Sequence, residues 1–273
     1  MGKFDGCLFV SDVDATLLRA DQTVSDANKR SIEYFINEGG RFTIATGRMV
    51  GEVQNIWDQV MINAPLILHN GSKVYDFESG VTIWEKFIEE ERKDRIRRFH
   101  DEISECGIEI YSGETVYIYR SCGDTQRFFK SICSVVYEMP DFVWEEPWQK
   151  VLIIGDTKEM LDRCGRMYRT EYDGGNCVRN GPKYLGVVAA GASKAAGMKI
   201  IAEKLGCKTL ISIGDSENDV DMLKVSDVSF AVENAVDAVK AAAKYIAPHF
   251  EKDGVAYAIN KLEEIIGVQG DKK

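Results

Sequence analysis

Short apolar runs that end abruptly in polar residues recur along this chain. Consecutive apolar residues, rather than alternating ones, are typical of strands that are buried on both faces of a parallel sheet. The clearest four runs cover residues 7–11, 42–45, 66–68 and 210–213, and polar clusters follow them at Asp12, 46–48, 69–71 and 214–215. We therefore predict four buried strands, each with polar side chains at its carboxyl end.

Helical patterns lie between these strands. Two examples are residues 25–37, where Ser25 is a suitable N-cap, and residues 194–205. Strands that alternate with helices indicate an α/β fold with right-handed crossovers. Ligands of such folds bind beyond the carboxyl ends of the strands, so we expect the polar clusters to converge there.

The middle of the chain has a different pattern. Residues 108–119 look like an amphipathic hairpin with its turn at 112–114, and helical patterns occupy residues 90–105, 125–136 and 158–172. The parallel-sheet pattern resumes near Gly191. We therefore predict a Rossmann-like parallel-sheet core formed by residues 1–85 and 189–273, and an inserted α+β cap formed by residues 86–188.

The charge balance narrows the choice of partners. Lys and Arg total 34 and Asp and Glu total 44, which gives a formal net charge of −10. An acidic surface repels nucleic acid and anionic membranes, so neither is an expected partner. An anionic small molecule would be repelled too, and a phosphate site must therefore carry its own local cations. The pattern does not encode an oligomeric state.

The cysteines and the N-terminus bear on the compartment. The seven cysteines are odd in number and form no CxxC pair, which favours reduced thiols over a disulfide framework or a zinc site. We see no signal peptide and no apolar run of the roughly 18 residues that a membrane span needs. We expect a cytoplasmic protein.

Asp12 and Asp14 form the first cluster that could carry chemistry. In an extended chain, residues two apart point to the same side, so both carboxylates would face one point. Such a pair needs a cation or a shared proton, and Mg²⁺ prefers carboxylate and phosphate oxygens. A plain strand-ending turn and the Asp-x-Asp of nucleotide-sugar glycosyltransferases remain alternatives. An EF-hand is excluded, because Leu17 and Thr23 stand where that loop needs Gly and Glu.

Residues 214–219 offer a further carboxylate at a strand end. Asp215 follows the strand, and Asn218 and Asp219 open the next helix, whose N-terminus is a favourable place for an anion. Helix capping by Asp215 or Ser216 is the structural alternative.

Two cations accompany these acids. Lys194 lies in a glycine-flanked segment, but Ser193 stands where a Walker A loop requires Gly, so a nucleotide-binding P-loop is rejected. Lys194 could still neutralise a phosphate, or it could be an ordinary exposed helix lysine. Residues 46–48 supply a hydroxyl, an accessible backbone amide and the cation of Arg48, unless they form only a strand-to-helix turn.

The order and spacing of these motifs carry more information than any one of them. Asp-x-Asp-x-Thr at 12–16, Thr-Gly-Arg at 46–48, Lys194 and Gly-Asp-x-x-Asn-Asp at 214–219 together resemble the haloacid dehalogenase (HAD) superfamily. The long insertion before Lys194 is similar to that of the Cof-type subfamily, whose α/β cap lies between the second and third motifs. The resemblance covers nearly the whole chain.

This resemblance implies a Mg²⁺-dependent phosphatase that hydrolyses phosphomonoesters of small metabolites, sugar phosphates first, through an aspartyl-phosphate. Asp12 would be the nucleophile and Asp14 the general acid and base. Asp12, the backbone carbonyl of Asp14, and Asp215 would hold Mg²⁺, and Asp219 would orient the groups around the metal. The phosphate-binding groups would be Thr46, Gly47, Lys194 and Asn218.

Two positions depart from the family pattern, since Ala15 and Glu233 stand where Gly is common. If the backbone of Ala15 needs a positive φ, alanine costs about 1 kcal/mol there. Two other functions stay open: a phosphomutase of the same superfamily, and a phosphometabolite-binding protein without turnover.

The cap is expected to close over the site and to supply specificity. Some of its aromatic residues could stack on a sugar ring or another flat substrate, although most are expected in the cap interior. We expect the charge-rich run at 89–98 to be a solvated helix face. The aromatic residues in question are Tyr111, Tyr117, Tyr119, Trp144, Trp148 and Tyr184.

Overall fold

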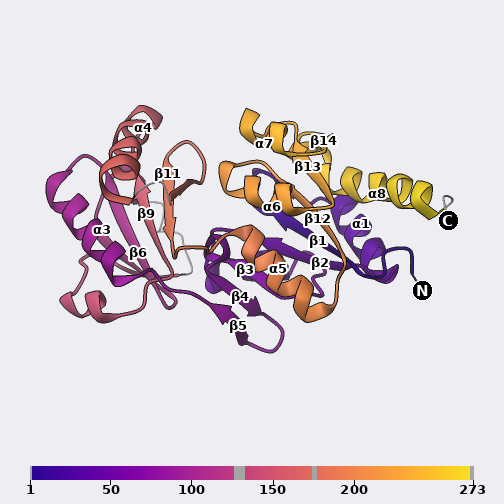
Figure 1. Cartoon of the computed structure of the whole chain (residues 1–273), viewed down its shortest axis with the longest axis horizontal. Coiled ribbons are helices and arrows are strands. Elements are labelled where there is room, and N and C mark those ends of the chain that lie inside the picture. Colours follow the sequence, from indigo (N-terminus) through magenta and orange to yellow (C-terminus); the bar gives the residue numbers. More distant parts are fainter. Residues whose placement is uncertain (1, 126–132, 174–176, 271–273) are drawn as a thin grey trace.

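The computed structural model contains two β-sheets in two lobes (Figure 1). It describes residues 2–125, 133–173 and 177–270. The larger sheet has eight strands in the order β14-β13-β12-β1-β2-β3-β4-β5, and the smaller has six in the order β10-β11-β9-β6-β7-β8. We call the lobe with the larger sheet the core and the lobe with the smaller sheet the cap.

The core contains the first and last parts of the chain, and both ends of the chain lie on its side away from the cap (Figure 1). Its strands are β1 (Cys7–Asp12), β2 (Arg41–Ala45), β3 (Leu66–Leu68), β4 (Lys73–Asp76), β5 (Val81–Glu85), β12 (Thr209–Gly214), β13 (Val228–Val232) and β14 (Tyr245–Ala247). Its α-helices are α1 (Asp26–Asn37), α2 (Gln54–Trp57), α5 (Lys194–Leu205), α6 (Val220–Val225), α7 (Asp237–Ala242) and α8 (Gly254–Gly270). Short 3₁₀ turns are η1 (Val50–Glu52), η2 (His69–Gly71), η6 (Glu217–Asp219) and η7 (Phe250–Lys252).

The cap contains the middle of the chain. Its strands are β6 (Gly107–Ser112), β7 (Thr115–Arg120), β8 (Ser134–Val136), β9 (Lys150–Ile154), β10 (Cys177–Arg179) and β11 (Tyr184–Val188). Its helices are α3 (Glu90–Glu102) and α4 (Lys158–Met167), followed by the π-helical turn η5 (Tyr168–Asp173), and η4 (Asp141–Glu145) is a 3₁₀ turn. The predicted α/β core with an inserted α+β cap is confirmed, while the exact boundaries at 85/86 and 188/189 stay predictions.

The four predicted strands lie side by side in the core sheet, in the order β12-β1-β2-β3, and all pair in parallel. Strand β1 shows why the runs are apolar at every position. Phe9 packs into the cluster with α1 and α8, whereas Leu8 and Val10 pack on the opposite face with α5 and α6. Because the strands are parallel, their carboxyl ends meet at one edge of the sheet.

The helix boundaries follow from local capping. The Ser25 hydroxyl accepts a hydrogen bond from the amide of Asn28 at 3.1 Å, so α1 begins where the sequence predicts. Ser193 caps α5 in the same way through the amide of Ala196, also at 3.1 Å. This second cap fixes Lys194 as the first residue of α5.

The cap sheet is mostly antiparallel, and its two faces have different neighbours. The predicted hairpin is confirmed as β6 and β7, with Gly113 in the left-handed region at its turn. One face of the sheet packs against α3 and α4, which lie on the side away from the core (Figure 1). The other face meets Met49 of the core. The cap sheet therefore directs one set of side chains toward the core.

Two predictions about the cap need correction. The helix predicted for 125–136 is wrong at its end, because Ser134–Val136 is strand β8, which pairs with β7; residues 126–132 lie outside the described residues. The run 89–98 forms the first turns of α3, but Arg92 and Lys93 are buried rather than solvated.

Candidate active site

The polar clusters at the strand ends line one cavity between the core and the cap, with a volume of about 780 Å³. Asp12 ends β1, residues 46–48 follow β2, η2 follows β3, and Asp215 follows β12. All four segments contribute to the lining. The parallel topology thus brings together residues as far apart in the sequence as Asp12 and Asp215.

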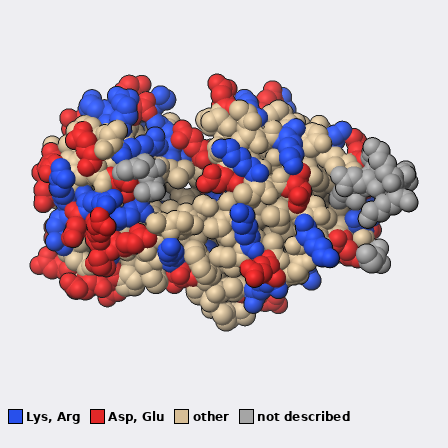
Figure 2. Space-filling model, viewed as in Figure 1, with Lys and Arg blue, Asp and Glu red and all other residues tan. Residues whose placement is uncertain are grey.

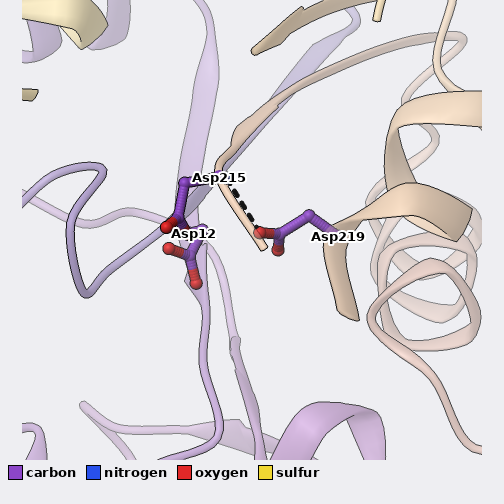
Figure 3. Close-up of side chains that lie close together, drawn as sticks. All are labelled: Asp12, Asp215 and Asp219. Atoms are coloured by element: carbon purple, nitrogen blue, oxygen red, sulfur yellow. Dashed lines mark hydrogen bonds between the residues drawn. The ribbon is translucent and has the colours of Figure 1, made fainter. Parts of the chain in front are cut away.

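Three carboxylates form the centre of the site (Figure 3). Asp12, Asp215 and Asp219 each place an oxygen within 4.8 Å of the others. Asp219 is fully buried, and its Oδ2 accepts hydrogen bonds from the amides of Asp215 and Ser216, both at 3.0 Å. Gly214 makes room for this arrangement, because a Cβ on it would lie 2.5 Å from the Asp219 carboxyl carbon. The acidic cluster is therefore held by backbone geometry as well as by side chains.

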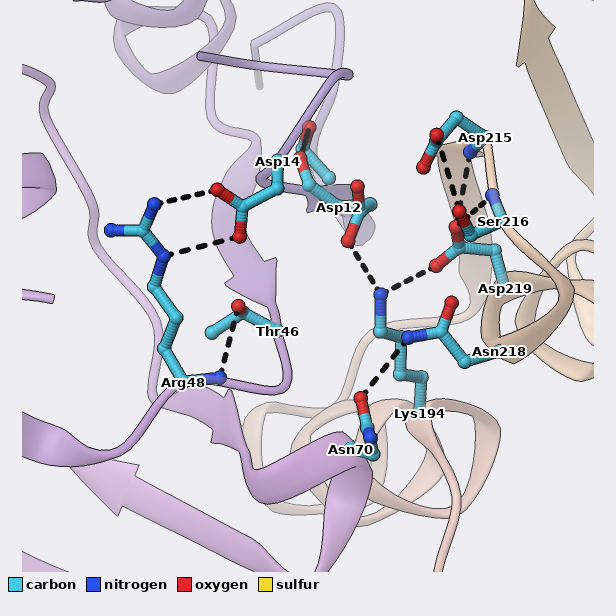
Figure 4. Close-up of polar contacts among 11 residues, drawn as sticks. Asp12, Asp14, Thr46, Arg48, Asn70, Lys194, Asp215, Ser216, Asn218 and Asp219 are labelled. Atoms are coloured by element: carbon cyan, nitrogen blue, oxygen red, sulfur yellow. Dashed lines mark hydrogen bonds and ion pairs between the residues drawn. The ribbon is translucent and has the colours of Figure 1, made fainter. Parts of the chain in front are cut away.

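Lys194 joins two of these acids. Its Nζ donates to Asp12 Oδ1 at 2.5 Å and to Asp219 Oδ1 at 2.6 Å (Figure 4). Its side chain is completely buried. Burial alone would lower the pKa of Lys194, but the charges of Asp12 and Asp219 outweigh it and raise the pKa, so the ammonium stays charged.

One lysine does not balance three carboxylates. Burial and the neighbouring negative charges raise the pKa of Asp12, and the same two causes raise that of Asp215. Among the described residues, Asp12 Oδ2 is buried and has no hydrogen-bond partner. A divalent cation between Asp12 and Asp215 would relieve both conditions, so the donor set fits Mg²⁺. Asp219 suits a supporting role, because both of its oxygens already accept hydrogen bonds.

Asp14 lies in the same cavity but in a different environment. Its side chain is 58% exposed, and Arg48 holds it through Nη2 to Oδ1 at 2.6 Å and Nε to Oδ2 at 3.1 Å. Figure 4 shows Asp12 directed toward Lys194 and Asp14 toward Arg48. The chain turns directly after Asp14, since Ala15 has φ of 57°. The two acids therefore lie in different environments. Asp12 is buried beside an ammonium, and Asp14 is accessible from the cavity.

The uncharged groups lie beside these acids. Thr46 is buried, and its Oγ1 accepts a hydrogen bond from the amide of Arg48 at 3.2 Å. Asn218 Nδ2 donates to Asn70 Oδ1 at 3.1 Å, and a Cβ on Gly47 would lie 3.1 Å from that same oxygen. Thr46, Gly47 and Asn218 all line the cavity. Lys194 lines a smaller adjoining pocket, which it shares with Asn218.

Asn70 was not among the site residues named from the sequence, although it lines the cavity. The residues of η2 have unusual backbones, with φ of 50° at His69, 57° at Asn70 and 98° at Gly71. A side chain at position 71 would collide with the Ser193 carbonyl, 2.0 Å from its Cβ. The Asn-Gly pair after a strand was the available signal, since both residues tolerate positive φ.

The cap contributes a second group of lining residues. They are Tyr111, Lys150, Leu152, Asn180 and Tyr184. Of the aromatic residues considered from the sequence, only Tyr111 and Tyr184 line this cavity, whereas Tyr119, Trp144 and Trp148 pack on one another within the cap. Sequence reasoning missed the other three residues, because alternation along β9 shows that positions 150 and 152 share a face but not which face points to the core.

The surface charge agrees with the expectation of local cations. In Figure 2, acidic and basic side chains are interspersed over both lobes, with a hollow between them. Within the cavity, Arg48 and Lys150 supply positive charge, and Lys194 contacts Asp12 from the adjoining pocket. None of the helices within the described residues is long and apolar enough to cross a membrane.

Comparison with known proteins gives a consistent result. A model of the haloacid dehalogenase-like hydrolases matches residues 9–259. The chain is 28% identical over 262 residues to 5-amino-6-(5-phospho-D-ribitylamino)uracil phosphatase of Bacillus subtilis, and the match covers 92% of this chain and 94% of that protein.

Two solved structures from Bacteroides thetaiotaomicron have the same fold. A haloacid dehalogenase-like hydrolase superposes with a TM-score of 0.75 at 26% identity, covering 95% of this chain and 99% of the other. A HAD-superfamily phosphatase superposes with a TM-score of 0.81 at 21% identity, covering 97% and 96%.

Proposed function

The chain belongs to the haloacid dehalogenase-like hydrolases and is a Cof-type phosphatase of that superfamily; from this we propose that it hydrolyses phosphomonoesters of small metabolites with Mg²⁺, through an aspartyl-phosphate on Asp12. The observation that carries the proposal is the buried Lys194, which bonds Asp12 and Asp219 beside Asp215. An acidic cluster with its own cation, open to a cavity, suits a phosphoryl group better than a neutral ligand.

The first step forms a bond between a carboxylate oxygen of Asp12 and phosphorus and breaks the bond from phosphorus to the ester oxygen. The electron pair of the broken bond goes to the departing oxygen, which takes a proton from Asp14. The exposure of Asp14 fits this role, because the acid must reach a leaving group in the cavity.

The second step returns Asp12 to its starting state. Asp14, now a carboxylate, takes a proton from water, and the water oxygen attacks phosphorus while the bond from phosphorus to Asp12 breaks. Inorganic phosphate leaves with the electron balance complete. The same acid thus serves both steps, which explains why one accessible carboxyl beside Asp12 is sufficient.

We assign the metal to Asp12, Asp215 and the backbone carbonyl of Asp14. When bound, Mg²⁺ supplies positive charge to the phosphoryl oxygens and orients them for in-line attack. Asp219 holds Lys194 and the amides of the Asp215 loop, so its role is to position the groups around the metal. Thr46, the backbone amide of Gly47, Lys194 and Asn218 bind the phosphoryl oxygens.

We propose that a small phosphorylated metabolite, rather than nucleic acid or a membrane, is the partner, and that the enzyme works in the cytoplasm. The net charge of −10 supports the first part, and the seven free thiols support the second. Sugar phosphates are the first class to test. A polyol phosphate attached to a flat ring, as in the name of the Bacillus subtilis relative, is the second class to test, because the partly exposed ring of Tyr184 lines the cavity.

The test is release of phosphate from a panel of both classes, with Mg²⁺ and with EDTA. Wild type should release phosphate only with the metal. Asp12→Asn should abolish turnover, and Asp14→Asn should lower kcat about 10²- to 10⁴-fold. Asp26→Asn changes an exposed aspartate at the start of α1 and should leave kcat unaltered.

Other outcomes would each overturn the proposal in a recognisable way. Full activity of Asp12→Asn would rule out the covalent route. An isomerised product without free phosphate would identify a phosphomutase. Tight binding of a panel member without turnover would identify a binding protein.

A further inference from the structure

Lys150 is a cap residue that reaches the phosphate-binding loop of the core. It begins strand β9 and is only 4% exposed, yet its Nζ donates to the carbonyl of Gly47 at 2.7 Å, across 103 positions of the chain. Its Nζ also lies 3.8 Å from the centre of the Tyr111 ring, which holds the ammonium by a cation–π contact. A buried cation is therefore directed at one backbone carbonyl of the other lobe.

That carbonyl belongs to a peptide unit that is held at both ends. The N–H of the same unit, on Arg48, donates to Thr46 Oγ1 at 3.2 Å. In a trans peptide the C=O and the N–H point in opposite directions, so one orientation satisfies both bonds. A positive charge on the carbonyl polarises the unit and strengthens the donation by its N–H.

The orientation of this peptide unit affects both Thr46 and Arg48. Because the Thr46 oxygen accepts from the backbone, its own O–H hydrogen is left to donate into the cavity that it lines. The Arg48 side chain, fixed by the same peptide unit, holds Asp14. The phosphoryl donor and the partner of the general acid are therefore set by one peptide orientation.

We propose that Lys150 is a positioning residue that makes the geometry of the 46–48 loop depend on docking of the cap. The proposal rests on the phosphatase function above. With the cap docked, Lys150 fixes the peptide between Gly47 and Arg48; with the cap swung away, the Gly47 carbonyl loses this cation. Turnover is thereby confined to the closed enzyme, where water is excluded from the cavity.

The chain provides a matched control in Lys93. This lysine is 3% exposed, donates to the carbonyls of Trp144 at 3.1 Å and Glu146 at 2.8 Å, and lies 5.1 Å from the Trp148 ring. It has the same burial, the same kind of acceptor and the same kind of ring contact as Lys150. All of these partners are in the cap, so its loss tests stability alone.

The experiment compares Lys150→Met with Lys93→Met. Both variants should lower the melting temperature, since each removes the hydrogen bonds that a buried lysine donates to backbone carbonyls. Lys150→Met should also lower kcat about 10- to 100-fold, by nearly the same factor for every substrate of the panel, because the defect lies at the phosphoryl group. Lys93→Met should keep the wild-type kcat. Lys150→Gln, a shorter neutral donor, replaces Lys150→Met if that variant does not fold.

A second readout does not require activity. Hydrogen–deuterium exchange at the Arg48 amide should become faster in Lys150→Met and remain at the wild-type rate in Lys93→Met. If wild type shows no turnover of any substrate, the proposed function fails, and this exchange result still decides the role of Lys150.

Three results would overturn the inference. The first is equal kcat for Lys150→Met and wild type. The second is a loss confined to one class of leaving group, which would make Lys150 a substrate contact instead. The third is unaltered protection of the Arg48 amide.

Discussion

The core and the cap each contain an ion pair whose charged side chains are almost completely buried. In the core, Lys194 and Asp219 have fully buried side chains, and that of Asp12 is 9% exposed. In the cap, the side chain of Arg92 is 6% exposed and that of Asp173 is fully buried. Burial of charge therefore does not by itself distinguish a functional site from a structural one.

What differs is the balance of charge and the access to it. Arg92 and Asp173 form a bidentate pair, with Nε to Oδ1 and Nη2 to Oδ2 both at 2.8 Å, and Arg92 Nη1 also donates to the Val188 carbonyl. In this pair one buried cation meets one buried anion, the partly exposed Glu89 carboxylate lies 3.8 Å from Arg92 Nη1, and neither Arg92 nor Asp173 lines the cavity. The core cluster sets one cation against three carboxylates, two of which line the cavity. Unbalanced charge beside an open space is the feature that supports the proposed catalytic role of the core cluster.

We expect the largest effect on activity from removing Lys194, the cation of the core cluster. Lys194→Met leaves the three carboxylates without their ammonium, so kcat should fall by at least about 10²–10³-fold. The unfolding free energy without metal should fall by about 3–5 kcal/mol, because buried charges lose their partner. Phosphate release and urea denaturation measure the two effects. Lys199→Met, at an exposed position of the same helix, is the control. Wild-type kcat in Lys194→Met would remove the cluster from the mechanism.

Removing the cap cation should affect stability only. Arg92→Met leaves Asp173 buried without its bidentate partner, and the unfolding free energy should fall by about 3–5 kcal/mol. Because the pair lies away from the cavity, kcat per folded molecule should remain that of wild type. Arg98→Met, which removes an exposed pair with Glu102 on the same helix, should cost at most about 1 kcal/mol. A large loss of kcat in folded Arg92→Met would erase the distinction between the two clusters.

The same contrast explains which features could be predicted from the sequence. In the core, each of these buried strands runs straight into a proposed site residue, and parallel pairing alone brings Asp12, Thr46 and Asp215 to one edge. In the cap, the burial of Arg92 could not be predicted, because it depends on Asp173, which lies 81 positions further along the chain. The choice of Tyr111 and Tyr184 over the other rings likewise depends on which sheet face meets the core.

Lys150 shows the same limit, since only tertiary packing reveals that its acceptor is in the other lobe. The error at Ser134–Val136 has a related cause. A three-residue strand at the sheet edge is stabilised by its neighbour β7 rather than by its own periodicity.

A smaller effect comes from a buried titratable group that has no ionic partner. His69 is fully buried near the Tyr111 ring, and burial, together with the charges of Lys150 and Lys73, lowers its pKa well below the ordinary value. Below about pH 6.5 the unfolded state therefore binds a proton at His69 that the folded state does not bind. Stability is complete above that pH and declines as the pH falls.

His69→Asn should remove this dependence, because asparagine does not titrate and tolerates the positive φ of position 69. Relative to the variant, wild type should lose up to about 2 kcal/mol of unfolding free energy between about pH 6.5 and 5. Urea denaturation at several pH values measures the difference. His249→Asn, at a partly exposed position, should keep the wild-type slope. Parallel curves for His69→Asn and wild type would show that His69 accepts its proton in the folded state.

The smallest expected effect concerns strain in the backbone. Among the described residues, those other than glycine with positive φ are Ala15, Gln22, His69, Asn70 and Asp253, all in the core. In the cap, Gly113 and Gly181 occupy this region. Two of the five core residues, Gln22 and Asn70, line the cavity, and Ala15 directly follows Asp14, which lines it too. Strain that persists beside a reaction centre is maintained by the surrounding contacts.

Ala15→Gly tests whether the backbone at Ala15 is strained. The sign of the change in unfolding free energy gives the answer. At φ of 57° the alanine Cβ costs about 1 kcal/mol, which glycine would recover, less the greater entropy that glycine gives the unfolded chain. The bond from Asn234 Nδ2 to the Ala15 carbonyl, 2.9 Å long, does not depend on the side chain and should persist. The variant should therefore be more stable than wild type by a few tenths to about 1 kcal/mol in urea denaturation.

Ala20→Gly, at an exposed position without positive φ, is the control. It should lower the unfolding free energy, because glycine relieves no strain there and only increases the entropy of the unfolded chain. Equal destabilisation by both substitutions would mean that the turn after Asp14 holds no strain, and that this loop of the core is as relaxed as the glycine turns of the cap.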